Sequence, residues 1–168
     1  AVKVVFSGIG YPYNDAYFSE RQPAGGWSPI RIIAVTYGID DHFRLETDPS
    51  GLAHLLWNGG DISGYADFLY ATERADGSWT EPVNLSQYHS HPGDADMVVD
   101  SQGAVHVLGS TDGIFYQMRV PEGSWNARVR LAAADGGGVS LAIDDQNRLH
   151  GVWGDRPLNQ VRYAMSAN

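Results

Sequence analysis

Histidine and aspartate gather in one short stretch of the chain, His89-Ser-His91-Pro-Gly-Asp94-Ala-Asp96. Imidazole and carboxylate groups bind several divalent metals. The spacing matches no standard metal site, so a solvated loop is the ordinary alternative and we expect no cofactor. If the chain does bind Ca²⁺ or another divalent cation, the candidate ligands are His89, His91, Asp94 and Asp96.

Aspartates in polar stretches are also candidates for acid–base chemistry. Hydrolysis of a glycosidic bond uses two carboxyl groups that flank the bond. The candidate catalytic residues are Asp61, Asp94 and Asp96. The sequence has no cysteine, which excludes thiolate catalysis, disulfides and cysteine-based metal sites.

Tyrosines lie beside aspartate, asparagine and arginine at several points of the chain. A tyrosine ring can stack on the apolar face of a sugar, while planar polar groups bond to its hydroxyls. These residues therefore favour a glycan or another small polar ligand as partner, and ordinary solvated loops are the alternative. The candidate ligand-binding residues are Tyr11, Tyr13, Asp15, Tyr37, Arg44, Asp61, Tyr65, Tyr88, Asp96 and Arg156.

Three further histidines belong to an internal repeat, Asp-x-x-(Gly/Asn)-x-x-His. Its copies span residues 48–54, 100–106 and 144–150. The aligned turn position requires a positive φ, and its occupants agree with that: Gly51, Gly103 and Asn147. Equivalent residues of successive repeats are not brought to one point. We therefore expect His54, His106 and His150 to be buried and hydrogen-bonded in a structural role, rather than to share a metal.

A second motif also occurs three times in the chain. An aromatic residue lies nine positions before a tryptophan in the pairs Phe18/Trp27, Tyr70/Trp79 and Tyr116/Trp125, with a glycine turn just before each tryptophan. Each repeat then predicts four short strands. In the repeat at 35–86, the second along the chain, these strands are 43–47, 52–57, 68–72 and 83–86. The inner two are apolar on both faces, so both faces must be covered. This pattern predicts the blades of a β-propeller, with a β-sandwich as the alternative.

We therefore expect an all-β fold, a β-propeller with about three and a half four-stranded blades in this chain. The expected segments are a partial blade at 1–34, blades at 35–86 and 87–132, and a partial blade at 133–168. The first segment starts at the second strand of a blade, and the last stops after the third. The exposed strand edge of an incomplete blade can pair with a strand of another chain. We expect a partial ring, completed by a homo-oligomer, by another chain or by flanking sequence. The alternative is a small four-bladed ring with two incomplete blades.

The repeat and the turn Asp76-Gly-Ser-Trp79 resemble the sialidase-like β-propellers, also called Asp-box or BNR-repeat proteins, of bacterial secreted proteins. The resemblance extends over almost the whole chain. It implies that Asp76, Trp79 and Trp125 serve the fold, and that the ligand face is built by the loops between second and third strands and by the links between blades. It also implies a catalytic set of three arginines, a Tyr–Glu pair and an acid/base aspartate. The chain does not show this set, and the family's Arg-Ile-Pro motif is absent.

Charge and hydropathy argue against some classes of binding partner. The net charge is −9, with 11 basic against 20 acidic residues, which argues against nucleic acid and anionic lipid as partners. No apolar run approaches the roughly 18 residues of a membrane helix. We expect an extracellular or cell-surface bacterial module for recognition or scaffolding, non-catalytic and glycan-binding. The alternatives are a sialidase-like glycoside hydrolase completed by missing blades or another chain, and a structural subunit that docks a partner through its blade edges.

Overall fold

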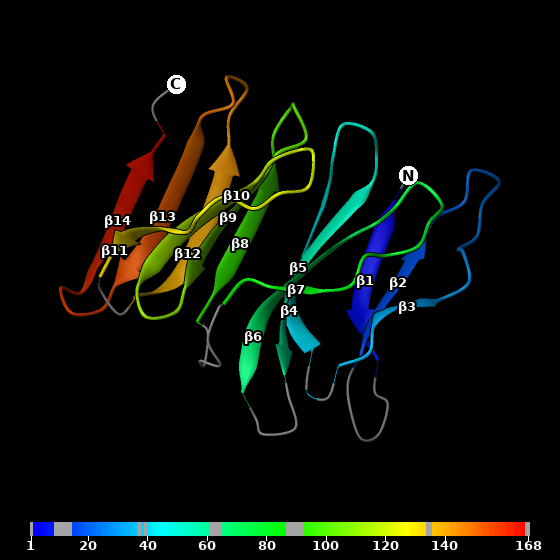
Figure 1. The fold of residues 1–168 in the computed structure, drawn as a ribbon, viewed down its shortest axis with the longest axis horizontal. Coiled ribbons are helices and arrows are strands. Elements are labelled where there is room, and N and C mark those ends of the chain that lie inside the picture. Colours follow the sequence, from blue (N-terminus) through cyan, green and yellow to red (C-terminus); the bar gives the residue numbers. More distant parts are fainter. Residues whose placement is uncertain are drawn as a thin grey trace. The chain divides into compact units, whose positions relative to one another are not determined.

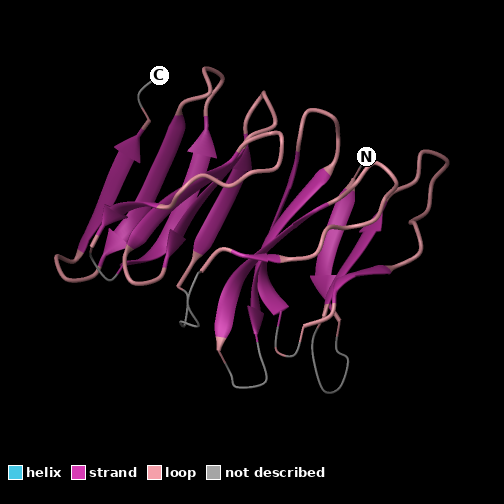
Figure 2. Cartoon of the chain, in the orientation of Figure 1, coloured by secondary structure: helices cyan, strands magenta, loops and turns pink. Residues whose placement is uncertain are grey.

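A computed structural model describes residues 2–8, 15–36, 38, 40–60, 65–86, 93–133 and 136–166. The secondary structure of these ranges consists of strands without a helix (Figure 2). The chain forms two compact units. Unit 1 comprises residues 1–47 and 51–91, and unit 2 comprises residues 48–50 and 92–168.

Unit 1 holds two antiparallel sheets (Figure 1). The first has the order β1-β2-β3, with β1 at Lys3–Ser7, β2 at Ala16–Glu20 and β3 at Arg31–Ala34. The second has the order β4-β5-β6-β7, with β4 at Asp40–Thr47, β5 at Ala53–Gly60, β6 at Ala66–Thr72 and β7 at Val83–Asn84.

Unit 2 also holds two antiparallel sheets. One has the order β11-β10-β9-β8, with β8 at Ala95–Val99, β9 at Val105–Ser110, β10 at Ile114–Arg119 and β11 at Val129–Ala132. The other has the order β12-β13-β14, with β12 at Gly136–Ile143, β13 at Leu149–Asp155 and β14 at Gln160–Met165.

This architecture confirms the predicted all-β class and the four strands of the second repeat. The structure differs at the ends of the inner strands, because β5 runs on through Asn58-Gly59-Gly60 to pair with the start of β6. An Asn-Gly-Gly sequence is typical of a turn. Here Gly59 pairs with Asp67 and Gly60 with Ala66, so the strand continues through both glycines.

The predicted turn position of the repeat has the predicted conformation. The φ angles are 86° at Gly51, 86° at Gly103 and 58° at Asn147. The repeat aspartate fixes this turn, since Asp100 Oδ1 accepts the backbone N–H groups of Gln102 and Ala104, both at 2.8 Å. Asparagine takes the left-handed conformation more readily than other residues with a side chain, which explains its place beside two glycines.

The repeat histidines are hydrogen-bonded in the structural role that the sequence predicts. The Nδ1 atoms lie 2.6, 2.8 and 2.9 Å from tyrosine hydroxyls in the pairs His54–Tyr70, His106–Tyr116 and His150–Tyr163. In unit 2 the Nε2 atoms face the repeat aspartates, at 3.3 Å for His106–Asp100 and 3.1 Å for His150–Asp144. His54 and His106 are buried as expected. The prediction of burial is wrong for His150, which is 30% exposed because its partner strand β14 is exposed.

The tryptophan turns share one hydrogen-bond pattern. Arg74 N–H donates to the Ser78 carbonyl and Gly77 N–H donates back to the Arg74 carbonyl, and the turns at 22–26 and 120–124 repeat this. Asp76 Oδ1 accepts the Ser78 hydroxyl at 2.7 Å and its N–H at 2.9 Å, and these bonds lower the pKa of Asp76. Asp76 therefore holds a turn, as predicted.

Each unit has its own apolar core. In unit 1, Phe18 of β2 packs with Leu55 and Trp57 of β5, and Trp79 meets the Phe18 ring edge-on with a centroid distance of 5.3 Å and an angle of 71°. In unit 2 the buried cluster is Leu108, Ile114, Val139, Leu141 and Trp153. The core of each unit thus joins two sheets face to face.

Candidate functional site

The structure describes six of the predicted site residues. Those outside the described residues are Tyr11, Tyr13, Tyr37, Asp61, Tyr88, His89 and His91. The six that can be located are Asp15, Arg44, Tyr65, Asp94, Asp96 and Arg156. They do not form one cluster, because three belong to each unit.

In unit 1, several polar residues lie at one end of the two sheets, where β1, β3 and β5 end and β2, β4 and β6 begin. We call this the loop end of unit 1 and define it by Gly8, Asp15, Thr36, Asp40, Gly60 and Tyr65. Small residues bring its segments together. A Cβ at Gly38 would lie 2.3 Å from the Gly60 backbone, so the β3–β4 link approaches the end of β5 as only glycine allows.

Two carboxylates at the loop end are connected by one threonine. The Thr36 backbone N–H donates to Asp15 Oδ1 at 3.3 Å, and the Thr36 hydroxyl donates to Asp40 Oδ1 at 2.8 Å. Asp15 is held in place from its own backbone as well, since Gly8 N–H donates to its carbonyl at 3.2 Å. Thr36 therefore fixes both acidic side chains beside each other.

The loop end also holds a buried carboxyl group, that of Asp40. Its residue exposure is 0%, and burial raises its pKa to about 6. The hydrogen bond from the Thr36 hydroxyl opposes this rise, while the charge of Asp15 adds to it. A buried carboxyl group with a raised pKa beside a second acidic side chain is an arrangement found in many acid catalysts.

Sequence reasoning did not place Asp40 among the site residues. Asp40, Asp41 and His42 form one polar run, and nothing in it separates the buried acid from its neighbours. Both aspartates lie in β4, where Asp40 pairs with Gly59 and Asp41 with Asn58. Successive side chains of a strand point to opposite faces of the sheet, so Asp40 is buried and Asp41 is not. Asp41 is exposed and contacts the His42 ring, with 2.7 Å between Oδ1 and Nδ1.

In unit 2, the carboxylates of Asp94 and Asp96 hold the neighbouring strand. Asp94 Oδ2 accepts the Gly138 N–H at 2.6 Å, and Asp96 Oδ2 accepts the Leu141 N–H at 2.9 Å. Both acceptors bind β12, so these side chains join the two sheets of unit 2. A catalytic role for Asp94 and Asp96 stays a prediction.

Arg44, Asp96 and Ser140 occupy equivalent registers on the first strands of three sheets, β4, β8 and β12. Arg44 pairs with Leu56, Asp96 with Leu108 and Ser140 with Val152, and each partner lies two residues after a repeat histidine. The remaining candidates lie apart. Arg156 is in the exposed β13–β14 turn against Gly137, and Tyr65 is 44% exposed at the start of β6.

A metal site has no support in the described part of the chain. No three His, Asp or Glu side chains gather there in a way that could hold an ion. His89 and His91 lie outside that part, so the Ca²⁺ or other divalent cation site stays a prediction. The described ranges also contain no helix of the length and apolarity that crossing a membrane requires.

Comparison with known proteins identifies the fold. No family model matches the chain, and no curated protein is similar to it in sequence. Among solved structures, a Hadza microbial sialidase matches 91% of the chain with a TM-score of 0.60 at 13% identity. An endo-arabinase from Bacteroides thetaiotaomicron matches 99% with a TM-score of 0.57 at 12% identity. The four sheets are blades of a β-propeller.

The likeness is one of fold, because identities of 12 and 13% carry no site residues across. The chain spans 38% of the length of the sialidase and 70% of that of the endo-arabinase.

Proposed function

We propose that the chain is a carbohydrate-recognition unit of a sialidase-like β-propeller, which binds a glycan at the loop end of unit 1 without cleaving it. The observation that carries the proposal is the pair of aspartates bridged by Thr36 at the same end as the exposed Tyr65. The two similar structures are named as enzymes that act on carbohydrate, which supports this ligand class. A glycan ligand suits an extracellular or bacterial cell-surface location, which is part of the proposal.

The chemistry of the loop end suits a sugar. The Tyr65 ring, 44% exposed, offers an apolar face for stacking, and Asp15 is an acceptor for hydroxyl groups. Asp40 is fully buried, so it supports Asp15 and the link rather than touching a glycosidic bond. Asp94 and Asp96 are bonded to backbone amides of β12. These uses of the carboxylates favour recognition over hydrolysis.

One observation favours a second function, a glycoside hydrolase. Burial raises the pKa of Asp40 to about 6, and Asp15 lies beside it on the same threonine. Such a pair is what general acid catalysis of glycoside cleavage needs. In this alternative the rest of the catalytic set comes from other blades or another chain.

A glycan array probed with the purified chain tests the proposal. We expect binding to a defined set of oligosaccharides, and at least about tenfold weaker binding by Tyr65→Ala. Tyr163→Ala is the matched control, because Tyr163 is also exposed but lies on β14 in unit 2. Loss of binding in both variants, or in neither, contradicts the proposed site.

A panel of aryl glycosides separates the two functions. Recognition predicts no turnover by the wild type. Turnover that falls by about 100-fold or more in both Asp15→Asn and Asp40→Asn would instead establish the hydrolase.

A further inference from the structure

His42 has a backbone conformation that is unusual for a residue with a side chain. Its φ angle is 53°, in the left-handed region. It lies in β4 at the bulge where the pairing shifts between Asp41 and Arg44, two residues after Asp40 of the loop end. Histidine is found in this region more often than most residues, but its Cβ atom makes the conformation less favourable than it is for glycine. The bulge therefore holds His42 under backbone strain.

The equivalent bulge in unit 2 shows which residue the backbone alone favours. In β12 the pairing shifts between Gly137 and Ser140, at the same place relative to the neighbouring strand. The position that corresponds to His42 is occupied there by Gly138, with a φ of 65°. Glycine adopts such a φ without strain. The fold thus requires a positive φ at this position but not an imidazole, and strained residues of this kind are frequent at functional sites.

Asp41 fixes the orientation of the imidazole ring. Asp41 Oδ1 lies 2.7 Å from His42 Nδ1. Because an ionised carboxylate only accepts hydrogen bonds, Nδ1 is the donor, and Nε2 of the neutral ring is an acceptor. Nε2 has no hydrogen-bond partner among the residues that the structure describes, and the His42 side chain is 59% exposed. The pair therefore presents one oriented acceptor to solvent beside the loop end.

His42 and Tyr65 lie too far apart to contact one sugar ring. The sheet order β4-β5-β6 places β5 between their strands. Asp41, Asn58 and Phe68 are partners in register, and Tyr65 comes three residues before Phe68. Two strand spacings of about 4.8 Å and three residues of about 3.3 Å each separate the two backbones by roughly 14 Å. A ligand that contacts both residues must therefore be an oligosaccharide.

We propose that His42 is a sugar-contact residue beside the loop end, and that the ligand is an oligosaccharide which stacks on Tyr65 and donates a hydroxyl group of a further sugar unit to His42 Nε2. Asp41 is the positioning residue, because it acts through the imidazole. This proposal rests on the proposed glycan recognition and adds to it a second contact and a minimum length of the ligand.

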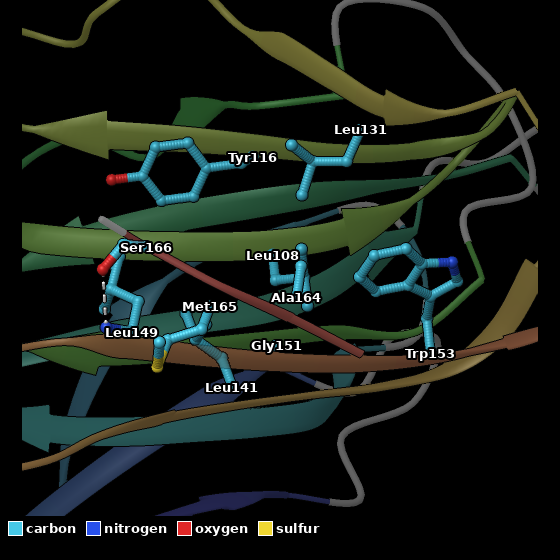
Figure 3. A pocket seen from close by; sticks show the side chains of 10 residues that line it. All are labelled: Leu108, Tyr116, Leu131, Leu141, Leu149, Gly151, Trp153, Ala164, Met165 and Ser166. Atoms are coloured by element: carbon cyan, nitrogen blue, oxygen red, sulfur yellow. Dashed lines mark hydrogen bonds between the residues drawn. The ribbon is translucent and has the colours of Figure 1, made fainter. Parts of the chain in front are cut away.

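The apolar pocket in unit 2 does not suit such a ligand. It has a volume of about 210 Å³ and is lined mainly by apolar side chains (Figure 3). The Tyr116 hydroxyl in its lining is bonded to His106, and the Ser166 hydroxyl accepts the Leu149 N–H. Sugar hydroxyl groups would therefore lose their bonds to water there without gaining others. The polar loop end of unit 1 is the better place for an oligosaccharide.

Calorimetric titration of the whole chain with sugars of two lengths tests the proposal. The probes are arabinobiose with arabinotetraose, and N-acetylneuraminic acid with sialyllactose. We expect the wild type to bind the longer member of one pair, and His42→Gly to bind it about tenfold more weakly, because one hydrogen bond is lost. The shorter member should bind to both proteins alike, whereas Tyr65→Ala should weaken the binding of both members.

The same variant separates a contact role from a structural one. Glycine relieves the strain of a positive φ, so the midpoint of urea unfolding of His42→Gly should equal that of the wild type or lie above it. Asn159→Gly is the matched control, because Asn159 has a φ of 50° in the β13–β14 turn of unit 2, and it should leave binding unchanged. Asp41→Ala should weaken binding of the longer sugar, and Asp41→Asn, which keeps an acceptor for Nδ1, should bind it as the wild type does.

The proposal is overturned if His42→Gly binds the longer sugar as tightly as the wild type, if it loses stability, or if it weakens the binding of both lengths equally. Each of these results leaves glycan recognition at the loop end standing, provided that Tyr65→Ala still weakens binding. If the wild type binds none of the four sugars, glycan recognition itself fails and this proposal fails with it.

Discussion

The carboxyl group of Asp40 shows how one residue takes its chemistry from its surroundings. A pKa raised to about 6 means that the folded state holds this proton more tightly than the unfolded state, where the ordinary value is 3.8. The stabilising effect of that proton is complete below about pH 4 and is lost as the pH rises through about 6. The difference amounts to about 3 kcal/mol at most.

Asp40→Asn should remove this pH dependence. The amide resembles the protonated acid and has no charge to bury, so the free energy of unfolding of the variant should fall less between pH 4 and pH 7 than that of the wild type. Urea unfolding at several pH values measures this. Asp145→Asn, at an exposed position, is the control. An unchanged slope in Asp40→Asn would show that Asp40 is ionised throughout this range.

The tyrosine partners of the repeat histidines offer a second test at the residue scale. Tyr116 is partly buried, and burial together with the charge of Asp100 raises its pKa, whereas Tyr163 is 59% exposed. Tyr116→Phe should lower the free energy of unfolding by about 1 kcal/mol, because it leaves His106 without its hydroxyl partner. Tyr163→Phe should lower it by less than half as much, since water replaces the lost bond. Equal losses in urea unfolding would contradict this account.

From residue types alone, the residues that serve the fold were easier to predict than those of the candidate site. The positive φ of Asn147 and the hydrogen bonds of His106 follow from local chemistry that the repeat makes visible. The burial of Asp40 does not, because it depends on a partner 19 positions away, Gly59, and on the approach of Gly38 to Gly60. Thr36 likewise bonds to Asp15, which lies 21 positions before it, as well as to Asp40, four positions after it.

At the scale of elements, the tryptophan turn links one sheet to the next. Trp79 closes its own turn by bridging to Glu73, and its ring packs on Phe18 of the neighbouring sheet. Trp79→Ala should therefore lower the free energy of unfolding by about 2–3 kcal/mol. Trp27 is the matched control, because it closes an equivalent turn but is 50% exposed, and Trp27→Ala should change stability by less than about 1 kcal/mol. Circular dichroism in urea measures both, and equal losses would show that the turn matters and the packing does not.

The sequence predicted the number and order of strands in the second repeat, but not all of their ends. β5 continues past Trp57 and β4 starts at Asp40, three residues before the predicted start. The polar ends of these strands have the composition of loops. They are strands because the register with their neighbours continues across a bulge between Asp41 and Arg44, which only the three-dimensional pairing shows.

At the scale of the whole molecule, the repeat predicted the blades because each copy of the first motif keeps one spacing from aspartate to histidine, and each copy of the second keeps one spacing from the aromatic residue to the tryptophan. The division into two compact units was not predicted, since both contain the same repeat. The sequence did not predict which ligand the chain would bind, because the loops differ from blade to blade while the repeated residues serve the fold.

The most direct test of the central claim, glycan recognition at the loop end of unit 1, is a nitrogen-15 NMR titration of the chain with an arabinan oligosaccharide and with sialyllactose. We expect one of the two to shift amide signals of Gly8, Asp15, Thr36, Gly60 and Tyr65, while the turns at Gly26 and Gly77, at the other end of the same sheets, stay unchanged. Shifts that centre on those turns, or no shifts with either sugar at millimolar concentration, would contradict the account.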